Sequence, residues 1–196
     1  RLKKLNFLSV CYNHQLKNIM KTISSEYFIR HQYFTARKDA YITENGKRVD
    51  PYFVVELPQS ACAMCITDSN EVLFAEQYRH AINKKILELP GGFIEKAETP
   101  EAGIARELQE ETGYTFKEII LLGTTAANPG LLNNYTYMFL ATGGVKTSAQ
   151  LLDDNEEINI IAEPLGKARQ MLAENKIVQS MHALCMFYAF KFLDKN

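Results

Sequence analysis

The sequence predicts an α/β (α+β) protein in which a mixed sheet is covered by helices and is preceded by a small antiparallel β subdomain. Two observations lead to this prediction. From Gln59 onward, strand-like stretches alternate with stretches of helical periodicity, and neighbouring strands are close enough to form hairpins. Before that point, residues 25–57 are rich in β-branched and aromatic residues and contain an Asn45-Gly46 turn.

The composition indicates a folded chain and excludes several classes of protein. The 196 residues, 46% of them hydrophobic, are enough to bury roughly 70% of the unfolded surface without a disulfide or a metal. Lys and Arg number 22 against 23 Asp and Glu, so the basic excess of a nucleic-acid binder is lacking. No apolar run approaches the roughly 20 residues of a membrane helix. We therefore expect a cytoplasmic protein with neither nucleic acid nor membrane as a partner.

The first part of the chain divides into two predicted segments. Leu5 to Ser24 has mixed helical periodicity, so residues 1–24 are predicted to form a helical extension. Residues 25–57 are predicted to form the β subdomain, in which Asn45-Gly46 makes a two-residue hairpin turn. A sheet this small is unstable alone, so the main domain or a partner must cover its apolar face.

The rest of the chain, residues 58–196, is predicted to form a single mixed domain. Its expected elements are strands near 60–67, 71–78, 117–125, 134–142 and 157–163, and helices near 100–112, 164–174 and 177–193, with a Pro90-Gly91-Gly92 loop before the first helix.

Cysteine usage argues against a disulfide framework, because Cys11, Cys62, Cys65 and Cys185 are few and scattered. Cys62 and Cys65 have the spacing of a redox or zinc pair. They lie, however, in a predicted strand, where residues three apart point to opposite faces. We therefore expect them to be small buried hydrophobic residues.

The helix predicted at 100–112 has strong end signals. Thr99 is a good N-cap, Pro100 suits the first helical position, and Gly113 favours termination. The side expected to face the sheet carries residues at 3.6-residue spacing, namely Ile104, Ala105, Leu108 and Thr112.

Three carboxylates, Glu107, Glu110 and Glu111, share another face of this helix. Like charges three and four residues apart destabilise a helix, whereas a divalent cation removes the conflict. Hard oxygen ligands on a fixed face suit Mg²⁺, with Mn²⁺ as the alternative, and Mg²⁺ commonly bridges to substrate phosphates. Arg106 can pair with Glu110 or with Glu98 and so orient the carboxylates. The alternative interpretation is a solvated acidic face.

This helix lies within a longer pattern that resembles the Nudix hydrolase signature. From Gly92 to Tyr114 the sequence matches every fixed position of G-x5-E-x7-R-E-U-x-E-E-x-G-U, where U is a bulky hydrophobic residue. Three flanking segments resemble the ADP-ribose and nucleoside-diphosphate-sugar pyrophosphatase branch of that family, namely Glu76 to His80, Leu87 to Glu95 and Asn128-Pro129-Gly130. Pro129 lies 16 residues after Gly113, the offset typical of that branch.

The resemblance implies an α/β/α sandwich over about residues 59–193, within a Nudix domain at 58–196. It implies a homodimer in which residues 25–57 of one subunit complete the other's nucleotide site. The implied reaction is Mg²⁺-dependent hydrolysis of ADP-ribose to AMP and ribose 5-phosphate. Alternative substrates are GDP-mannose, another nucleotide sugar or a dinucleotide. A non-catalytic nucleotide-sensing module is a further alternative, but it would be expected to have lost the box glutamates, which are all present.

The same resemblance assigns roles within the signature. Glu107 and Glu111 would be the principal metal ligands, and Gly91 would contribute its backbone carbonyl. Glu110 would be a further or water-mediated ligand. Glu110 and Arg106 also belong to the implied catalytic set, in which Arg106 has a supporting role.

In this branch the base that activates water comes from a loop after the box, and the acidic run 153–157 lies at that place. Alignment with the strand that follows makes Glu156 the first choice, ahead of Asp154 and Glu157. The alternative is an ordinary solvated charge run.

Four residues are expected to bind the substrate. Arg79 is expected to hold a phosphate or the terminal ribose, with an ordinary surface ion pair as the alternative, and Glu88 to accept sugar hydroxyls. Phe53, or Tyr52 beside it, is expected to stack on the base, although aromatic residues in strands more often belong to a core. Pro129 is included through the family resemblance.

Overall fold

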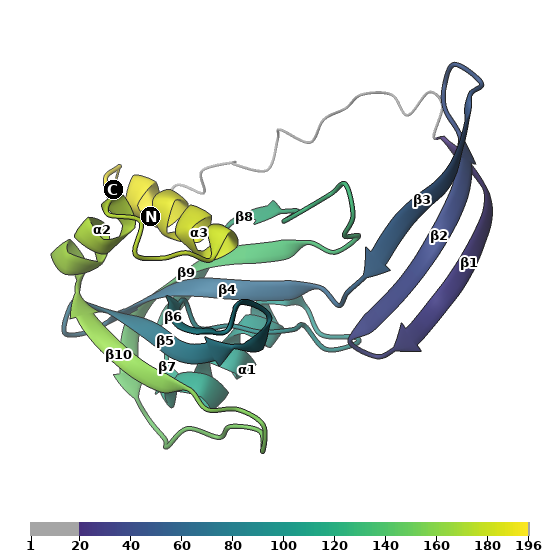
Figure 1. Ribbon diagram of the computed structural model, residues 1–196. Coiled ribbons are helices and arrows are strands. Elements are labelled where there is room, and N and C mark those ends of the chain that lie inside the picture. The colour runs from purple at the N-terminus through teal and green to yellow at the C-terminus, as the bar shows by residue number, and fades with distance from the viewer. Residues whose placement is uncertain (1–19, 196) are drawn as a thin grey trace.

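The computed structural model describes residues 20–195, which form two sheets and three α-helices (Figure 1). The strands are β1 (Lys21–His31), β2 (Phe34–Ile42), β3 (Arg48–Glu56), β4 (Ser60–Thr67), β5 (Glu71–Arg79), β6 (Lys84–Glu88), β7 (Tyr114–Thr115), β8 (Glu118–Thr125), β9 (Thr136–Lys146) and β10 (Asn159–Pro164). The helices are α1 (Pro100–Thr112), α2 (Leu165–Ala173) and α3 (Ser180–Leu193), and a short 3₁₀ turn, His80–Ile82, joins β5 to β6. Within the described residues, no helix is long and apolar enough to cross a membrane.

The strands pair in two separate sheets. The first is antiparallel, in the order β1-β2-β3. The second has seven strands, with the path β10-β5-β4-β9-β7, while β6 pairs with β5 and β8 pairs with β9. Strands β4 and β9 run parallel, and the other pairs are antiparallel. The predicted mixed fold with a small antiparallel N-terminal sheet is confirmed.

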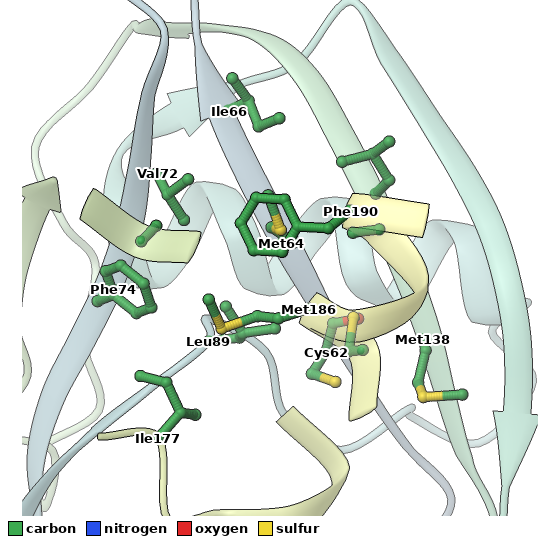
Figure 2. Close-up of a cluster of buried hydrophobic side chains, with 14 of the residues drawn as sticks. Cys62, Met64, Ile66, Val72, Phe74, Leu89, Met138, Ile177, Met186 and Phe190 are labelled. Atoms are coloured by element: carbon green, nitrogen blue, oxygen red, sulfur yellow. The ribbon is translucent and has the colours of Figure 1, made fainter. Parts of the chain in front are cut away.

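Helices cover the main sheet on both faces. On one face, Met64 of β4 and Phe74 of β5 pack with Met186 and Phe190 of α3 in a buried cluster that also includes residues of α2 (Figure 2). On the other face, residues of α1 pack with Ala63 and other alternate residues of β4. The α/β/α arrangement that the resemblance implied is therefore confirmed.

The cysteines of β4 follow the alternation of the strand. Cys62 belongs to the cluster under α3, and Cys65 belongs to the cluster under α1. Both are free and buried. Contact with the Cys185 thiol and burial raise the pKa of Cys62, and burial raises the pKa of Cys65. The prediction that they are buried apolar residues on opposite faces is confirmed.

The three-stranded sheet lies apart from the main sheet (Figure 1). It leaves much apolar surface in solvent. All eleven residues of β1 are exposed. The rings of Phe28 and Phe53 lie 6.3 Å apart, and these residues are 52% and 54% exposed. An apolar face of this kind usually marks an interaction surface.

The link between the two sheets is held by hydrogen bonds to the segment before β9. The backbone of Val55 accepts from Asn133 at 3.2 Å and donates to Leu131 at 2.8 Å. The Asn134 side chain donates to the carbonyl of Pro58 at 3.1 Å, and Tyr135 N–H donates to the Gln59 side chain at 2.8 Å. Residues 55–59 are therefore anchored to residues 131–135.

Three sequence predictions need correction. The predicted helix at residues 1–24 is wrong for Lys21–Ser24, which extend β1 by pairing with β2, while residues 1–19 lie outside the described residues. The predicted hairpin exists, but Glu44 and Asn45 are central in its turn, which Gly46 N–H closes on Thr43. Gly46 follows them in the left-handed conformation, with φ of 75°. The loop between β2 and β3 is therefore longer than two residues. Ala105 is exposed rather than packed on the sheet.

Candidate active site

Helix α1 has the ends that its sequence predicts. The Thr99 hydroxyl accepts from Ala102 N–H at 3.2 Å, and Pro100 is the first helical residue. At the other end Gly113 is left-handed, with φ of 73°, and its N–H donates to Gln109 at 2.9 Å. Because both ends are capped, the positions of the glutamates on this helix are fixed relative to the sheet.

A single guanidinium, that of Arg106, gathers three carboxylates on one side of α1. It donates to Glu98 at 2.9 and 3.1 Å, to Glu107 at 3.0 Å and to Glu110 at 2.8 Å, and it also donates to the carbonyl of Phe93. These contacts raise the pKa of Arg106 and, from the other side, lower that of Glu98. Both predicted partners of Arg106, Glu98 and Glu110, are thus found together.

Glu111 is the most deeply buried of the signature carboxylates, with 5% exposure. Its carboxylate accepts from Gly91 N–H at 2.8 Å. Burial raises its pKa to about 8, and the charges of Glu107 and Glu156 act in the same direction. Burial also raises the pKa of Glu107, assisted by the charges of Glu110 and Glu156. The negative charges are therefore concentrated where solvent screens them poorly.

The glycines before α1 allow a close approach of the loop to its neighbours. Gly91 has φ of 143°, and a Cβ built there would lie 2.2 Å from the carbonyl oxygen of Ala61 and 2.7 Å from Cys62 Cα. A Cβ on Gly92 would instead meet the Glu107 carboxylate at 2.7 Å. The first glycine lets the loop pack against β4, and the second leaves room for Glu107.

The donor set fits a hard divalent cation, because it consists of carboxylate oxygens and the carbonyl of Gly91. As they are placed, no three His, Cys, Asp or Glu side chains in residues 20–195 are grouped closely enough to hold a metal ion. The Arg106 guanidinium donates to one carboxylate oxygen each of Glu107 and Glu110, and Gly91 N–H donates to one oxygen of Glu111. Ligation of a cation therefore requires these carboxylates to move closer together than they are here.

Arg79 and Glu88 form a pair beside this cluster. The guanidinium donates to the Glu88 carboxylate at 2.7 Å, and Glu88 is 2% exposed while the Arg79 side chain is 45% exposed. The positive charge of Arg79 also lowers the pKa of the Glu111 carboxyl. The ion pair that was the alternative for Arg79 is therefore present, with a half-exposed guanidinium and a buried carboxylate.

His182 of α3 holds the backbone just before the glycine loop, a role that the sequence did not predict. Its Nδ1 accepts from Leu89 N–H at 3.1 Å, between Glu88 and the Pro90-Gly91-Gly92 loop. Burial and the charge of Arg79 lower its pKa to about 3, so the ring stays neutral and can accept. Since 93 residues separate His182 from Leu89, no local pattern could have revealed this bond.

The acidic run lies in an exposed loop before β10, at residues 153–157. The Glu156 carboxylate accepts from Asp153 N–H at 3.1 Å, and Glu156 N–H donates to the Asp153 carbonyl at 2.9 Å. The charge of Glu156 raises the pKa values of Glu107 and Glu111.

The aromatic residues predicted to stack on the base make contacts within the chain. Phe53 packs beside Phe28 on the exposed face of the small sheet, whereas the Tyr52 hydroxyl donates to the carbonyl of Gly130, next to Pro129. Another pair, missed by the sequence analysis, stacks beside the glycine loop: the rings of Tyr33 and Phe93 lie 6.0 Å apart at an interplanar angle of 13°.

Comparison with protein families assigns two regions of the chain. Residues 57–182 match the model of the NUDIX domain. Residues 20–55 match the model of the nucleoside diphosphate sugar hydrolase N-terminal domain. The boundary between these matches coincides with the link between the two sheets.

Individual relatives cover nearly the whole chain. It is 31% identical to the methanol dehydrogenase activator of Bacillus methanolicus, over 86% of this chain and 91% of that protein. It is 27% identical to the ADP-ribose pyrophosphatase of Bacillus subtilis strain 168, over 86% and 94%. Among solved structures, one described as an ADP compounds hydrolase superposes with a TM-score of 0.79 at 18% identity, covering 91% of this chain and 96% of that one. This last likeness bears on the fold alone.

Proposed function

Because the chain belongs to the Nudix family and begins its described part with a nucleoside diphosphate sugar hydrolase N-terminal domain, we propose that it hydrolyses the pyrophosphate bond of nucleoside diphosphate sugars. ADP-ribose, split into AMP and ribose 5-phosphate, is the proposed substrate. The name of the Bacillus subtilis relative supports this choice over GDP-mannose or a dinucleotide.

One observation carries the proposal: Glu107 and the buried Glu111 lie against the Gly91-Gly92 loop with raised pKa values. A structural helix gains nothing from a carboxylate buried among like charges, because its ionisation opposes folding. A cation would remove that penalty. The non-catalytic alternative offers no reason to keep these charges.

We propose that Glu107, Glu111 and the Gly91 carbonyl hold Mg²⁺, with Glu110 as a further ligand and Mn²⁺ as a substitute. The cation, when bound, neutralises phosphate oxygens and lowers the pKa of an attacking water. Arg106 orients the carboxylates of Glu107 and Glu110 through its hydrogen bonds to them. When Glu107 and Glu110 turn toward a cation, its contact with Glu98 keeps the guanidinium in place.

We propose that Arg79 binds a phosphate or the terminal ribose of the substrate. Its guanidinium is held by the buried Glu88, nearly half of its side chain is exposed, and its charge acts on Glu111. Glu88 thereby aligns Arg79, and its predicted contact with sugar hydroxyls stays a prediction. Pro129 and Phe53 remain proposed contacts of the nucleotide.

A panel of nucleotide sugars with Mg²⁺, resolved by chromatography, tests the function. ADP-ribose, GDP-mannose, a uridine nucleotide sugar and a dinucleotide separate the candidate substrates. The proposal expects AMP and ribose 5-phosphate in equal amounts from ADP-ribose. Absence of hydrolysis of every compound in the panel would contradict the proposed function.

Glu156 is our proposed general base, and its substitution gives a direct prediction. Glu156→Gln is expected to lower kcat about 10²- to 10⁴-fold, because the neutral amide cannot take a proton from water. KM should change little, since Glu156 lies in an exposed loop. Glu157→Gln and Asp154→Asn are the controls. A large effect of either control, with Glu156→Gln active, would assign the base to that residue instead.

We propose a homodimer joined through the exposed face of the three-stranded sheet, with residues of one subunit completing the other's nucleotide site. The extent of apolar exposure around Phe28 and Phe53 supports it. Sedimentation at micromolar concentration is expected to give about twice the 22.3 kDa chain mass. Phe28→Asp should shift the protein to the monomer. The control is Leu121→Asp, at a residue exposed on β8. A monomeric wild type would contradict the proposal.

The Bacillus methanolicus relative suggests a second candidate function, the activation of a partner dehydrogenase. Alcohol oxidation by such an enzyme, measured with and without this protein, tests it. The Glu111→Gln variant separates two routes: activation by binding persists in the variant, whereas activation by hydrolysis is lost. As compartment we propose the cytoplasm, where buried free thiols remain reduced.

A further inference from the structure

We propose that Gln150 is a positioning residue, which clamps the acidic loop to the glutamate-bearing helix and thereby places Glu156. Its side-chain amide donates to the carbonyl oxygen of Glu111 at 2.6 Å and to that of Ile158 at 3.1 Å. Glu111 is in α1, and Ile158 is the last residue before β10. The inference rests on the proposed function, which makes Glu156 the base.

Both ends of the loop are attached at the same end of α1. At its start, Leu151 N–H donates to the carbonyl of Glu110 at 2.8 Å. At its end, Ile158 is buried and is held through Gln150. Residues 153–157 between these attachments are exposed. The loop is therefore free in the middle and fixed at both ends.

Helix capping alone does not account for Gln150. The last carbonyls of a helix lack partners within it, and a single donor satisfies one of them. A side-chain amide has two N–H bonds, and here the second goes to Ile158, which lies outside the helix. The Gln109 and Glu110 carbonyls have backbone donors of their own, from Gly113 and Leu151. The bond to Ile158 contributes to loop position rather than to helix termination.

Fixed ends matter because Glu156 must move to act. In the structure its carboxylate accepts from Asp153 N–H within a local turn of the loop. When that turn opens, fixed loop ends restrict the positions that the Glu156 carboxylate can reach, whereas a free end would let those positions spread. A misplacement of about 1 Å costs on the order of 10²-fold in rate.

Gln150→Met tests the clamp, because methionine keeps the size and removes both donors. We expect kcat to fall about 10- to 100-fold while KM stays within about threefold. The matched control is Gln109→Met, because Gln109 and Gln150 line the same cavity of 560 Å³. The Gln109 side chain makes no hydrogen bond within residues 20–195, so this control should retain wild-type kcat.

A double-mutant cycle shows whether Gln150 acts through Glu156. In the Glu156→Gln background, Gln150→Met is expected to cause no further loss, because the group that it positions is already neutral. Hydrogen exchange supplies a readout independent of activity: amides of residues 152–158 should exchange faster in Gln150→Met, with those of 101–108 unchanged. If Gln150→Met does not fold, Gln150→Asn is tested in the same cycle. The asparagine side chain is shorter, so its amide cannot reach the carbonyls of both Glu111 and Ile158.

The outcomes are distinguishable. Equal losses in both backgrounds, or faster exchange throughout α1, would make Gln150 a general structural residue and overturn the inference. Full kcat in Gln150→Met, with Glu156→Gln impaired, would overturn it as well. If the wild type hydrolyses no nucleotide sugar, the proposed function fails, and the exchange experiment alone decides the clamp.

Discussion

Glu111→Gln is expected to lower kcat by about 10³-fold or more while leaving the fold intact. Glutamine has the same size, and its carbonyl oxygen can still accept from Gly91 N–H, as the carboxylate does at 2.8 Å. What it removes is the charge of a proposed metal ligand. Steady-state hydrolysis at saturating Mg²⁺ measures the effect, and activity within tenfold of wild type would exclude Glu111 as a ligand.

The pH dependence of stability gives the same variant a second readout. Without metal, the pKa of Glu111 lies at about 8, against an ordinary value of 4.5. Its protonated form therefore favours the folded state, and this contribution is lost as pH rises through about 8. In EDTA, the melting temperature of the wild type should fall more between about pH 5 and 9 than that of Glu111→Gln. Adding Mg²⁺ should raise the melting temperature of the wild type more than that of Glu111→Gln.

Gly91→Ala is expected to destabilise the protein by about 3 kcal/mol, which corresponds to roughly 6–12 °C in melting temperature, and to abolish most activity. The new Cβ would meet the backbone of β4, at Ala61 and Cys62, in the buried core of the sheet. Neither side can yield without moving the strand. The Gly91 carbonyl, a proposed metal ligand, would move with the loop.

Two other glycines serve as controls for that result. A Cβ on Gly92 meets the movable carboxylate of Glu107, so Gly92→Ala should keep its melting temperature and lose activity. A Cβ on Gly166 of α2 meets nothing within 4 Å, so Gly166→Ala should be stable and fully active. A wild-type melting temperature in Gly91→Ala would contradict the close-approach argument.

Local signals explain which elements the sequence predicts well. The bounds of α1 are predicted to the residue, because Thr99, Pro100 and Gly113 mark its ends and its periodicity is clear. Lys21–Ser24 carry no comparable signal and become a strand through pairing with β2. Strand β6, which the sequence analysis does not predict, likewise depends on its pairing with β5.

The candidate site divides in the same way. The box carboxylates and Arg106 are apparent from spacing along one helix, and Glu98, in the loop before that helix, is apparent from the signature. The burial of Glu88 depends on tertiary packing, and His182 and Gln150 reach backbone groups far along the chain or outside their own elements. Spacing identifies residues that share an element or lie next to it, but it does not reveal side chains that bond to backbone groups in a distant part of the fold.

The anchoring of residues 55–59 on residues 131–135 has a consequence for biosynthesis. The three-stranded sheet leaves the ribosome before its anchor, which is made about 75 residues later, roughly 4–15 s at ordinary rates of translation. During that interval its aromatic face and its edge strand are unprotected, in a nascent chain crowded by others like it. Chaperone supply during translation, rather than the stability of the finished enzyme, should therefore set the yield of this protein.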